Sequence, residues 1–314
     1  FRKYRRIFVP SAMLEKIGIK AEEYDPKTSL LVVAGTGISF GETQEFMKFL
    51  LDSGYGVSSI ENPIGGLFDI GINPKAERAI ALMHLLEFLR DLKYNGEPSV
   101  EGVDMLIQSY ATYDVVRLLS SNPHKYKGFI KSITFINPAG LNGKLRFFFH
   151  CVRFLYHHML KGYCRQISNL FGGNPYPFVI DDPNRKDYIR RELRALNSWL
   201  FNTCKNPVKT LREVDDLVTF RIEWLLERLS KEYGFDIYIF KQTDDAVLPA
   251  ELTLNNAEKI LSASHIIKAP GQHNDIFSQT WQRPNLIEHI KNVRQRRRVS
   301  KAADNQDDQD FEEQ

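Results

Sequence analysis

Short apolar runs alternate along most of the chain with longer segments of helical periodicity. Helices with apolar residues three and four positions apart are predicted at Glu42–Leu51, Lys75–Leu92, Tyr113–Leu119 and Glu251–Leu261. Strands are predicted at short β-rich runs, which are Ser29–Ala34, Gly56–Ile60, Val103–Ile107, Ile130–Ile136, Phe235–Phe240 and His265–Ala269. The alternation predicts an α/β fold with a mostly parallel central sheet that is flanked by helices on both faces.

The middle of the chain, residues 141–229, breaks this alternation. It contains no convincing strand but several helical stretches, including Leu145–Tyr163 and Asp187–Leu200. An all-helical insert between two strands of a sheet is typical of a cap. We therefore expect a core formed by residues 29–140 and 230–290, with a helical cap inserted between the two parts.

The two ends of the chain are strongly charged. Residues 1–28 begin with the basic run FRKYRRIF, which is predicted to be a solvated arm, with peripheral contact to an anionic membrane surface as the alternative. Residues 291–314 are first basic, at Arg294–Arg298, and then acidic, with almost no apolar residues. This composition predicts a disordered tail.

Composition narrows the class of protein only moderately. Of the 314 residues, 43% are hydrophobic and 26% are charged, and the net charge of +3 is too small to indicate a nucleic-acid partner. The three cysteines favour neither a zinc site nor a disulfide framework. No apolar run reaches the roughly 18 residues of a membrane span. A cytoplasmic protein is favoured, although the chain begins at Phe1 rather than Met, which leaves room for a targeting or anchor segment upstream.

Ser109 is the first candidate for chemistry. It follows the strand that ends near Gln108 and directly precedes a predicted helix. A serine on such a turn projects its oxygen above the sheet, and the amino end of the helix favours negative charge that develops there. Taken alone, the same pattern also fits a serine that only caps a turn.

Two later segments supply a possible base and acid for this serine. Asp244 and Asp245 follow the strand Phe235–Phe240, and His273 follows the strand His265–Ala269. Loops at the carboxyl ends of parallel strands meet at one edge of the sheet, where a catalytic triad can assemble. The order serine, aspartate, histidine along the chain is the one used by α/β-hydrolases.

The sequence resembles the α/β-hydrolase family, specifically cap-bearing serine hydrolases of the esterase and lipase type. DDAVLP is similar to the acid loop of the family and favours Asp245 over Asp244, while PGQHND is similar to its histidine loop. NPAG after the strand Ile130–Ile136 is similar to the segment that leads into the cap. The resemblance covers nearly all of Ser29–Ile290, and it implies that Ser109, Asp245 and His273 form a catalytic triad.

The resemblance also implies an oxyanion hole. VVAGTGIS is similar to the oxyanion loop of the family, with Ala34 in place of the usual histidine, so Thr36 and Tyr110 would each contribute a backbone N–H. The turn around the serine departs from the family pattern G-x-S-x-G, because Ile107 and Ala111 replace its two glycines.

The activity implied is cleavage of a carboxylic ester or thioester through an acyl-enzyme on Ser109, with no cofactor and no metal. The predicted cap contains LRFFFHCVRFLYHHMLKGY, whose aromatic residues would suit an apolar acyl or aromatic substrate if one face closes over Ser109. Docking of the cap onto the core explains the same residues equally well. The oligomeric state is not determined by these features.

Three other functions stay open. An acyltransferase would use the same triad with another acceptor, and a non-catalytic binding protein could retain the fold with a degenerate serine turn. A dinucleotide-binding oxidoreductase is favoured less. Gly35, Gly37 and Gly41 follow a strand and Glu61 follows the next one, as in nucleotide-binding folds. That function leaves Asp245 and His273 without a role.

Overall fold

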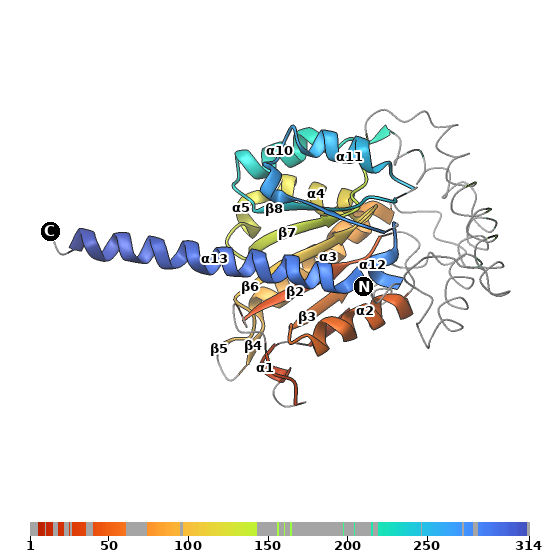
Figure 1. The fold of residues 1–314 in the computed structure, drawn as a ribbon. Coiled ribbons are helices and arrows are strands. Elements are labelled where there is room, and N and C mark those ends of the chain that lie inside the picture. The colour runs from red at the N-terminus through yellow and green to blue at the C-terminus, as the bar shows by residue number, and fades with distance from the viewer. Residues whose placement is uncertain are drawn as a thin grey trace.

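A computed structural model of the protein contains a seven-stranded sheet with helices on both faces (Figure 1). The structure describes residues 6–9, 11–14, 18–21, 25, 27–35, 40–60, 74–94, 97–142, 219–245, 247–271, 273–278 and 282–312, and six isolated positions between 156 and 215. The sheet strands are β1 (Arg6–Val9), β2 (Thr28–Val33), β3 (Val57–Ile60), β6 (Gly102–Gln108), β7 (Ile130–Ile136), β8 (Ile237–Gln242) and β9 (Ile266–Ala269).

Helices connect these strands. The longer ones are α2 (Phe40–Asp52), α3 (Pro74–Asp91), α4 (Ala111–Ser121), α10 (Glu223–Lys231), α11 (Ala250–Ala257) and α13 (Arg283–Glu312). The shorter elements are α1 (Ser11–Leu14), α5 (Pro123–Tyr126), α12 (Asp275–Ser278), the 3-10 helix η3 (Ala263–His265), and a small hairpin of β4 (Lys93–Tyr94) and β5 (Glu97–Pro98).

The strand order is β1-β3-β2-β6-β7-β8-β9. Only the β1–β3 pair is antiparallel, and every other neighbouring pair in this sheet is parallel. Strands β2, β6 and β8 are buried along their whole length, as expected of parallel strands that are covered on both faces. This arrangement confirms the α/β fold class that the sequence predicts.

The sheet separates two hydrophobic cores. In β2, Leu31 and Val33 belong to one core and Leu30 and Val32 to the other, because successive side chains of a strand point to opposite faces. The first core includes buried residues of α3, α4 and α10, and the second includes buried residues of α2, α12 and α13. The strands are packed between the two layers of helices, so the loops at the carboxyl edge begin from buried positions.

The amino-terminal arm is not wholly solvated. Strand β1 pairs with β3 over four residues, from Arg6 opposite Ile60 to Val9 opposite Val57. The prediction of a solvated arm over residues 1–28 is therefore wrong for this segment. The strand RIFV consists of one arginine followed by three apolar residues, so its apolar side chains can pack at the edge of the sheet.

The carboxyl-terminal tail is also different from the prediction. Residues 291–312, expected to be disordered, continue helix α13. Arg294 is 1% exposed, and its side chain bonds Asp104, which lies 190 positions earlier in the chain. Charge composition predicted disorder because it shows neither such a distant partner nor the burial of a guanidinium group.

The predicted cap falls mostly outside the described residues, which omit 143–218 except for six isolated positions. At the carboxyl end of that predicted region, Ile222, Leu226 and Leu229 lie in the core beside α4. These three residues therefore belong to the core, although the sequence analysis assigned residues up to 229 to the cap. Among the described residues, no helix is long and apolar enough to cross a membrane.

Candidate active site

Ser109 lies on a sharp turn between β6 and α4. Its φ of 53° is in the left-handed region, which is uncommon and strained for a residue with a side chain. The turn is held by the Ser109 N–H, which donates to the Ile136 carbonyl at 2.9 Å, and by the Ser109 carbonyl, which accepts from the Ala139 N–H at 3.3 Å. Backbone strain supported by such bonds is typical of a serine that is presented above a sheet.

The strained turn forms although the sequence lacks the glycine two positions before the serine. Ile107 is fully buried and pairs in register with Val33 on one side and Phe135 on the other. It also belongs to the hydrophobic core that includes α3 and α4. The isoleucine therefore contributes to the core in the last part of the strand, and the serine turn is formed with this larger residue in place.

His273 and Asp245 complete a continuous hydrogen-bonded chain with the serine. The Ser109 Oγ atom lies 2.7 Å from His273 Nε2, and His273 Nδ1 lies 2.8 Å from Asp245 Oδ2. Their loops follow β6, β8 and β9 at one edge of the sheet. The structure thus brings together the three residues that the sequence identified, from positions up to 164 residues apart.

The Asp245 carboxylate is held on both of its oxygens. Oδ1 accepts hydrogen bonds from the N–H groups of Val247 and Leu248, each at 2.9 Å. Burial alone would raise the pKa of Asp245, but the charges and hydrogen bonds of His273 and Lys241 lower it well below its ordinary value. The acid therefore stays ionised at neutral pH, although its side chain has no exposed surface.

Lys241 is a second basic partner of the same carboxylate, and the sequence analysis did not identify it. Its ammonium group donates to Asp245 Oδ2, the oxygen that also bonds His273, and to the Leu248 carbonyl at 2.9 Å. Both side chains of this ion pair are fully buried. A lysine within the buried strand IYIFKQ was the signal available in the sequence, because an isolated charge is almost never buried without a partner.

Gln108, the residue before the serine, joins the loops on either side of it. Its Oε1 accepts the Gly35 N–H at 2.8 Å, while its Nε2 donates to Asn274 Oδ1 at 3.0 Å. A Cβ atom at position 35 would collide with the Gln108 side chain and would lie 2.8 Å from Ser109 Cβ, so only glycine fits there. The start of the predicted oxyanion loop is thereby tied to the histidine loop.

Asn137 fixes the histidine loop from the other side. Its amide donates to the His273 carbonyl at 2.8 Å and to Gln242, and its Oδ1 accepts the Gln242 N–H at 2.9 Å. Asn137 also has a φ of 47°, a conformation that asparagine tolerates better than most residues. Asn137 belongs to the NPAG segment. The resemblance of this segment to the family indicated where the cap begins, but it did not indicate that Asn137 fixes the histidine loop.

The predicted oxyanion donors are only partly within the described residues. Tyr110 follows Ser109 directly and is the N-cap of α4, whereas Thr36 lies outside the described residues. Gly37 and Glu61, which carried the dinucleotide alternative, are outside them as well. Among the described residues, no three His, Cys, Asp or Glu side chains are grouped so that they could hold a metal ion.

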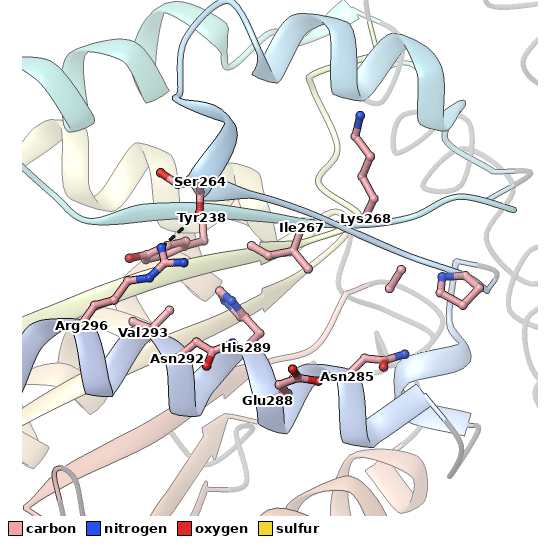
Figure 2. Close-up of a pocket in the computed structure, with 12 residues that line it drawn as sticks. Tyr238, Ser264, Ile267, Lys268, Asn285, Glu288, His289, Asn292, Val293 and Arg296 are labelled. Carbon is pink, nitrogen blue, oxygen red and sulfur yellow. Dashed lines mark hydrogen bonds between the residues drawn. The ribbon is translucent and has the colours of Figure 1, made fainter.

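A separate groove of about 280 Å³ lies between the edge of the sheet and α13 (Figure 2). It is lined by Tyr238, Ile267 and several residues of α13, among them His289 and Arg296. The lysine at its rim, Lys268, points away from α13 (Figure 2), and it pairs with Glu258. None of the three residues of the hydrogen-bonded chain lines this groove, so it is not the site of the serine chemistry.

Comparison with known proteins identifies the fold. No family model and no curated protein matches the sequence. Among solved structures, similar ones include the α/β-hydrolase enzyme MGS-MChE2 from a sediment metagenome of the Mar Chica lagoon in Morocco, with a TM-score of 0.51 and 13% identity over 93% of this chain and 96% of the other. The esterase EaEST from Exiguobacterium antarcticum has a TM-score of 0.57 and 10% identity over 93% and 95% of the two chains.

A bromoperoxidase from Bacillus anthracis is similar over 92% of this chain and 94% of its own, with a TM-score of 0.57 and 14% identity. These likenesses extend over nearly the whole of each chain. The chain therefore has the α/β-hydrolase fold, as the resemblance of its motifs implied.

Proposed function

On this fold, we propose that the protein is a serine hydrolase that cleaves a carboxylic ester or thioester through an acyl-enzyme on Ser109. The observation that carries the proposal is the chain of contacts from the Ser109 Oγ through both nitrogens of His273 to Asp245. The serine is presented on a strained turn, and the acid is buried and ionised. The similarity in fold to the esterase from Exiguobacterium antarcticum supports the same activity.

In the first half of the reaction, the Ser109 O–H donates to His273 Nε2 while the Nδ1–H of the histidine donates to Asp245. As the Ser109 oxygen attacks the carbonyl carbon, its proton passes to Nε2, and Asp245 stabilises the resulting imidazolium. The backbone N–H groups of Tyr110 and Thr36 stabilise the tetrahedral oxyanion, typically by about 3 kcal/mol for each donor. The imidazolium then protonates the leaving alcohol or thiol as the bond from carbon to the leaving group breaks.

In the second half, His273 takes a proton from water, whose oxygen attacks the acyl carbon. The bond from this carbon to the Ser109 oxygen breaks, the serine recovers its proton from the histidine, and a carboxylic acid is released. We propose an apolar acyl or aromatic substrate, because the aromatic residues between Leu145 and Tyr163 would line an apolar pocket if they close over the serine.

A fluorophosphonate probe, which reacts only with an activated serine, tests the proposed nucleophile. Stoichiometric labelling of the wild-type protein is expected, with loss of labelling in Ser109→Ala and in His273→Ala. Two matched controls are Ser264→Ala and His265→Ala, which alter an exposed serine and a half-buried histidine at the β9 edge and should label as the wild type does. If the folded wild-type protein is not labelled, the hydrolase function is contradicted, and a non-catalytic binding protein with the α/β-hydrolase fold is favoured instead.

Nitrophenyl esters of increasing chain length test the substrate class. Faster turnover of medium chains than of acetate is expected, and a preference for acetate would remove the apolar acyl pocket from the proposal. Adding an alcohol to the same assay distinguishes the acceptors. A transferase would form the new ester in preference to the free acid, whereas a hydrolase would release the acid as the main product.

A further inference from the structure

The buried Lys241 has no part in the mechanism described above, yet it touches the triad acid directly. Its ammonium group and the His273 ring share one oxygen of Asp245, and its second bond, to the Leu248 carbonyl, reaches the same loop whose N–H groups bind the other carboxylate oxygen. Lys241 therefore contacts both the carboxylate and the backbone that orients it.

The shared oxygen has an electrostatic consequence. While His273 is neutral, Lys241 provides the positive charge that a carboxylate without solvent contact needs. When His273 takes a proton, two cations compete for the same carboxylate, so the protonated form gains less from Asp245 than it would gain without the lysine. A base whose protonated form is stabilised less remains free of its proton down to a lower pH.

We propose that Lys241 is a positioning residue that holds Asp245 ionised and sets the lower pH limit at which His273 can accept the serine proton. This inference rests on the proposed serine-hydrolase function. With Lys241 in place, His273 can therefore accept the serine proton at a lower pH than it could without the lysine. Burial lowers the pKa of Lys241 while the carboxylate of Asp245 acts against that shift, so the two groups depend on each other for their charge.

The other charged groups around this pair lie on four neighbouring segments. The direct charges on Asp245 are those of Lys241 and His273. The remaining groups are Asp244, whose carboxylate accepts the Gly271 N–H, the exposed Glu251 on α11, Asp275 at the start of α12, and Lys268, which lies in register with Lys241 on β9 but is exposed and paired with Glu258.

The rate of fluorophosphonate labelling as a function of pH tests the inference. In Lys241→Met, His273 should hold its proton to higher pH, so the acidic midpoint of the labelling rate should move upward by about one to three pH units. The variant Lys241→Gln, which keeps a donor but removes the charge, should shift in the same direction. The matched control is Lys268→Met, which removes the lysine in register on the neighbouring strand and should leave the midpoint unchanged.

A structural role alone would give a different result. If Lys241 only supports the loop, Lys241→Met and Lys241→Gln would lower the labelling rate equally at every pH, and the unchanged midpoint would overturn the proposal. A second measurement does not depend on activity. The NMR titration of the His273 ring, assigned with His273→Gln, should move to higher pH in either Lys241 variant, even if the wild-type protein fails to label.

The two measurements separate the possible failures. A wild-type protein that does not label, together with a shifted ring titration, would contradict the hydrolase function but support the role of Lys241. A wild-type protein that labels, together with an unshifted titration in both variants, would support the hydrolase and contradict the role of Lys241.

Discussion

Two buried aspartates lie towards opposite ends of the sheet strands, and each bonds two basic side chains. Asp245, after the carboxyl end of β8, bonds His273 and Lys241. Asp104, near the beginning of β6, accepts from Arg294 Nε at 2.9 Å and from Arg297 at 2.6 Å. The two clusters are thus alike in burial and in the number of basic partners, but not in the kind of basic group.

The kind of cation decides what each cluster can do. Arginine stays protonated in proteins, so the charges around Asp104 are fixed, and Arg294 also donates to the carbonyls of Asp25 and Thr28. This cluster ties α13 to β2 and β6. Histidine and lysine can both release a proton, so the charge around Asp245 can change while the backbone stays in place. The comparison indicates a structural clamp at one end and distinguishes it from the candidate active site at the other.

Removing the charge of Asp245 should have the largest effect. In Asp245→Asn, the His273 ring loses the group that fixes its tautomer, and the labelling rate should fall about 10⁴-fold, as in serine proteases with the same change. The variant also leaves Lys241 buried without a negative partner, so its melting temperature should fall. Labelling kinetics and thermal unfolding measure the two effects separately.

The double variant Asp245→Asn with Lys241→Met distinguishes these effects. Replacing the lysine by an apolar side chain of similar length removes the unpaired charge, so the melting temperature should recover while the labelling rate stays low. A double variant that labels at nearly the wild-type rate would contradict the role given to Asp245.

Removing the charge of Asp104 should affect stability and leave chemistry intact. Asp104→Asn leaves two arginines facing a neutral amide, and breaking a buried ion pair in this way typically costs about 3–5 kcal/mol of the free energy of unfolding. Urea unfolding measures the loss, with the exposed Asp91→Asn as control. The labelling rate of the folded fraction should be unchanged. A large loss of labelling in that fraction would show that the two ends of the sheet are coupled.

The residues of the candidate site could be located from sequence because each one follows the end of a strand. Ser109, Asp245 and His273 each follow a strand of the sheet, and their order along the chain narrowed the choice further. The sheet strands from β2 onward and the α/β class followed from the same apolar patterns. Apolar patterns are a strong signal here because the central strands β2, β6, β7 and β8 are buried almost completely and the connecting helices cover the faces of the sheet.

The buried charges could not be predicted in full, because the fold decides which partner each of them meets. Lys241 needs the loop that follows its own strand, and Arg294 needs Asp104 from the other half of the chain. A run of arginines at the end of a chain has the composition of a disordered tail. The difference lies in tertiary contacts, which stabilise α13 although its sequence is strongly polar.

A third buried group, His289 on α13, should make the stability of the Asp104 side depend on pH. Burial and the charge of Arg296 lower the pKa of His289 from 6.5 to about 4, so the folded protein holds it neutral. Between these two values the unfolded chain binds more protons than the folded one, so stability falls as the pH is lowered from about 6.5 to about 4. The loss from this group should approach about 3 kcal/mol at pH 4.

The variant His289→Gln isolates this contribution. Glutamine can still reach Thr134, which lies 3.0 Å from His289 Nε2, but it does not titrate. Urea unfolding at a series of pH values should show a smaller loss between pH 6.5 and 4 in the variant, while the acidic midpoint of labelling stays where it is. Equal losses in both proteins would mean that His289 is not kept neutral by the fold.

The smallest effect is expected at the far end of α13, and it defines where the clamp ends. Figure 1 shows the last part of this helix extending away from the sheet, and Val299 is 64% exposed. A chain that ends after Ser300 keeps Arg294 and Arg297, so its melting temperature should stay within about 1 °C of the wild type. A chain that ends after Asn292 loses both arginines, leaves Asp104 without cations, and should melt several degrees lower. If the two truncations melt at the same reduced temperature, the stabilising contacts of α13 lie beyond Ser300, and the arginine cluster is not what ties the helix to the sheet.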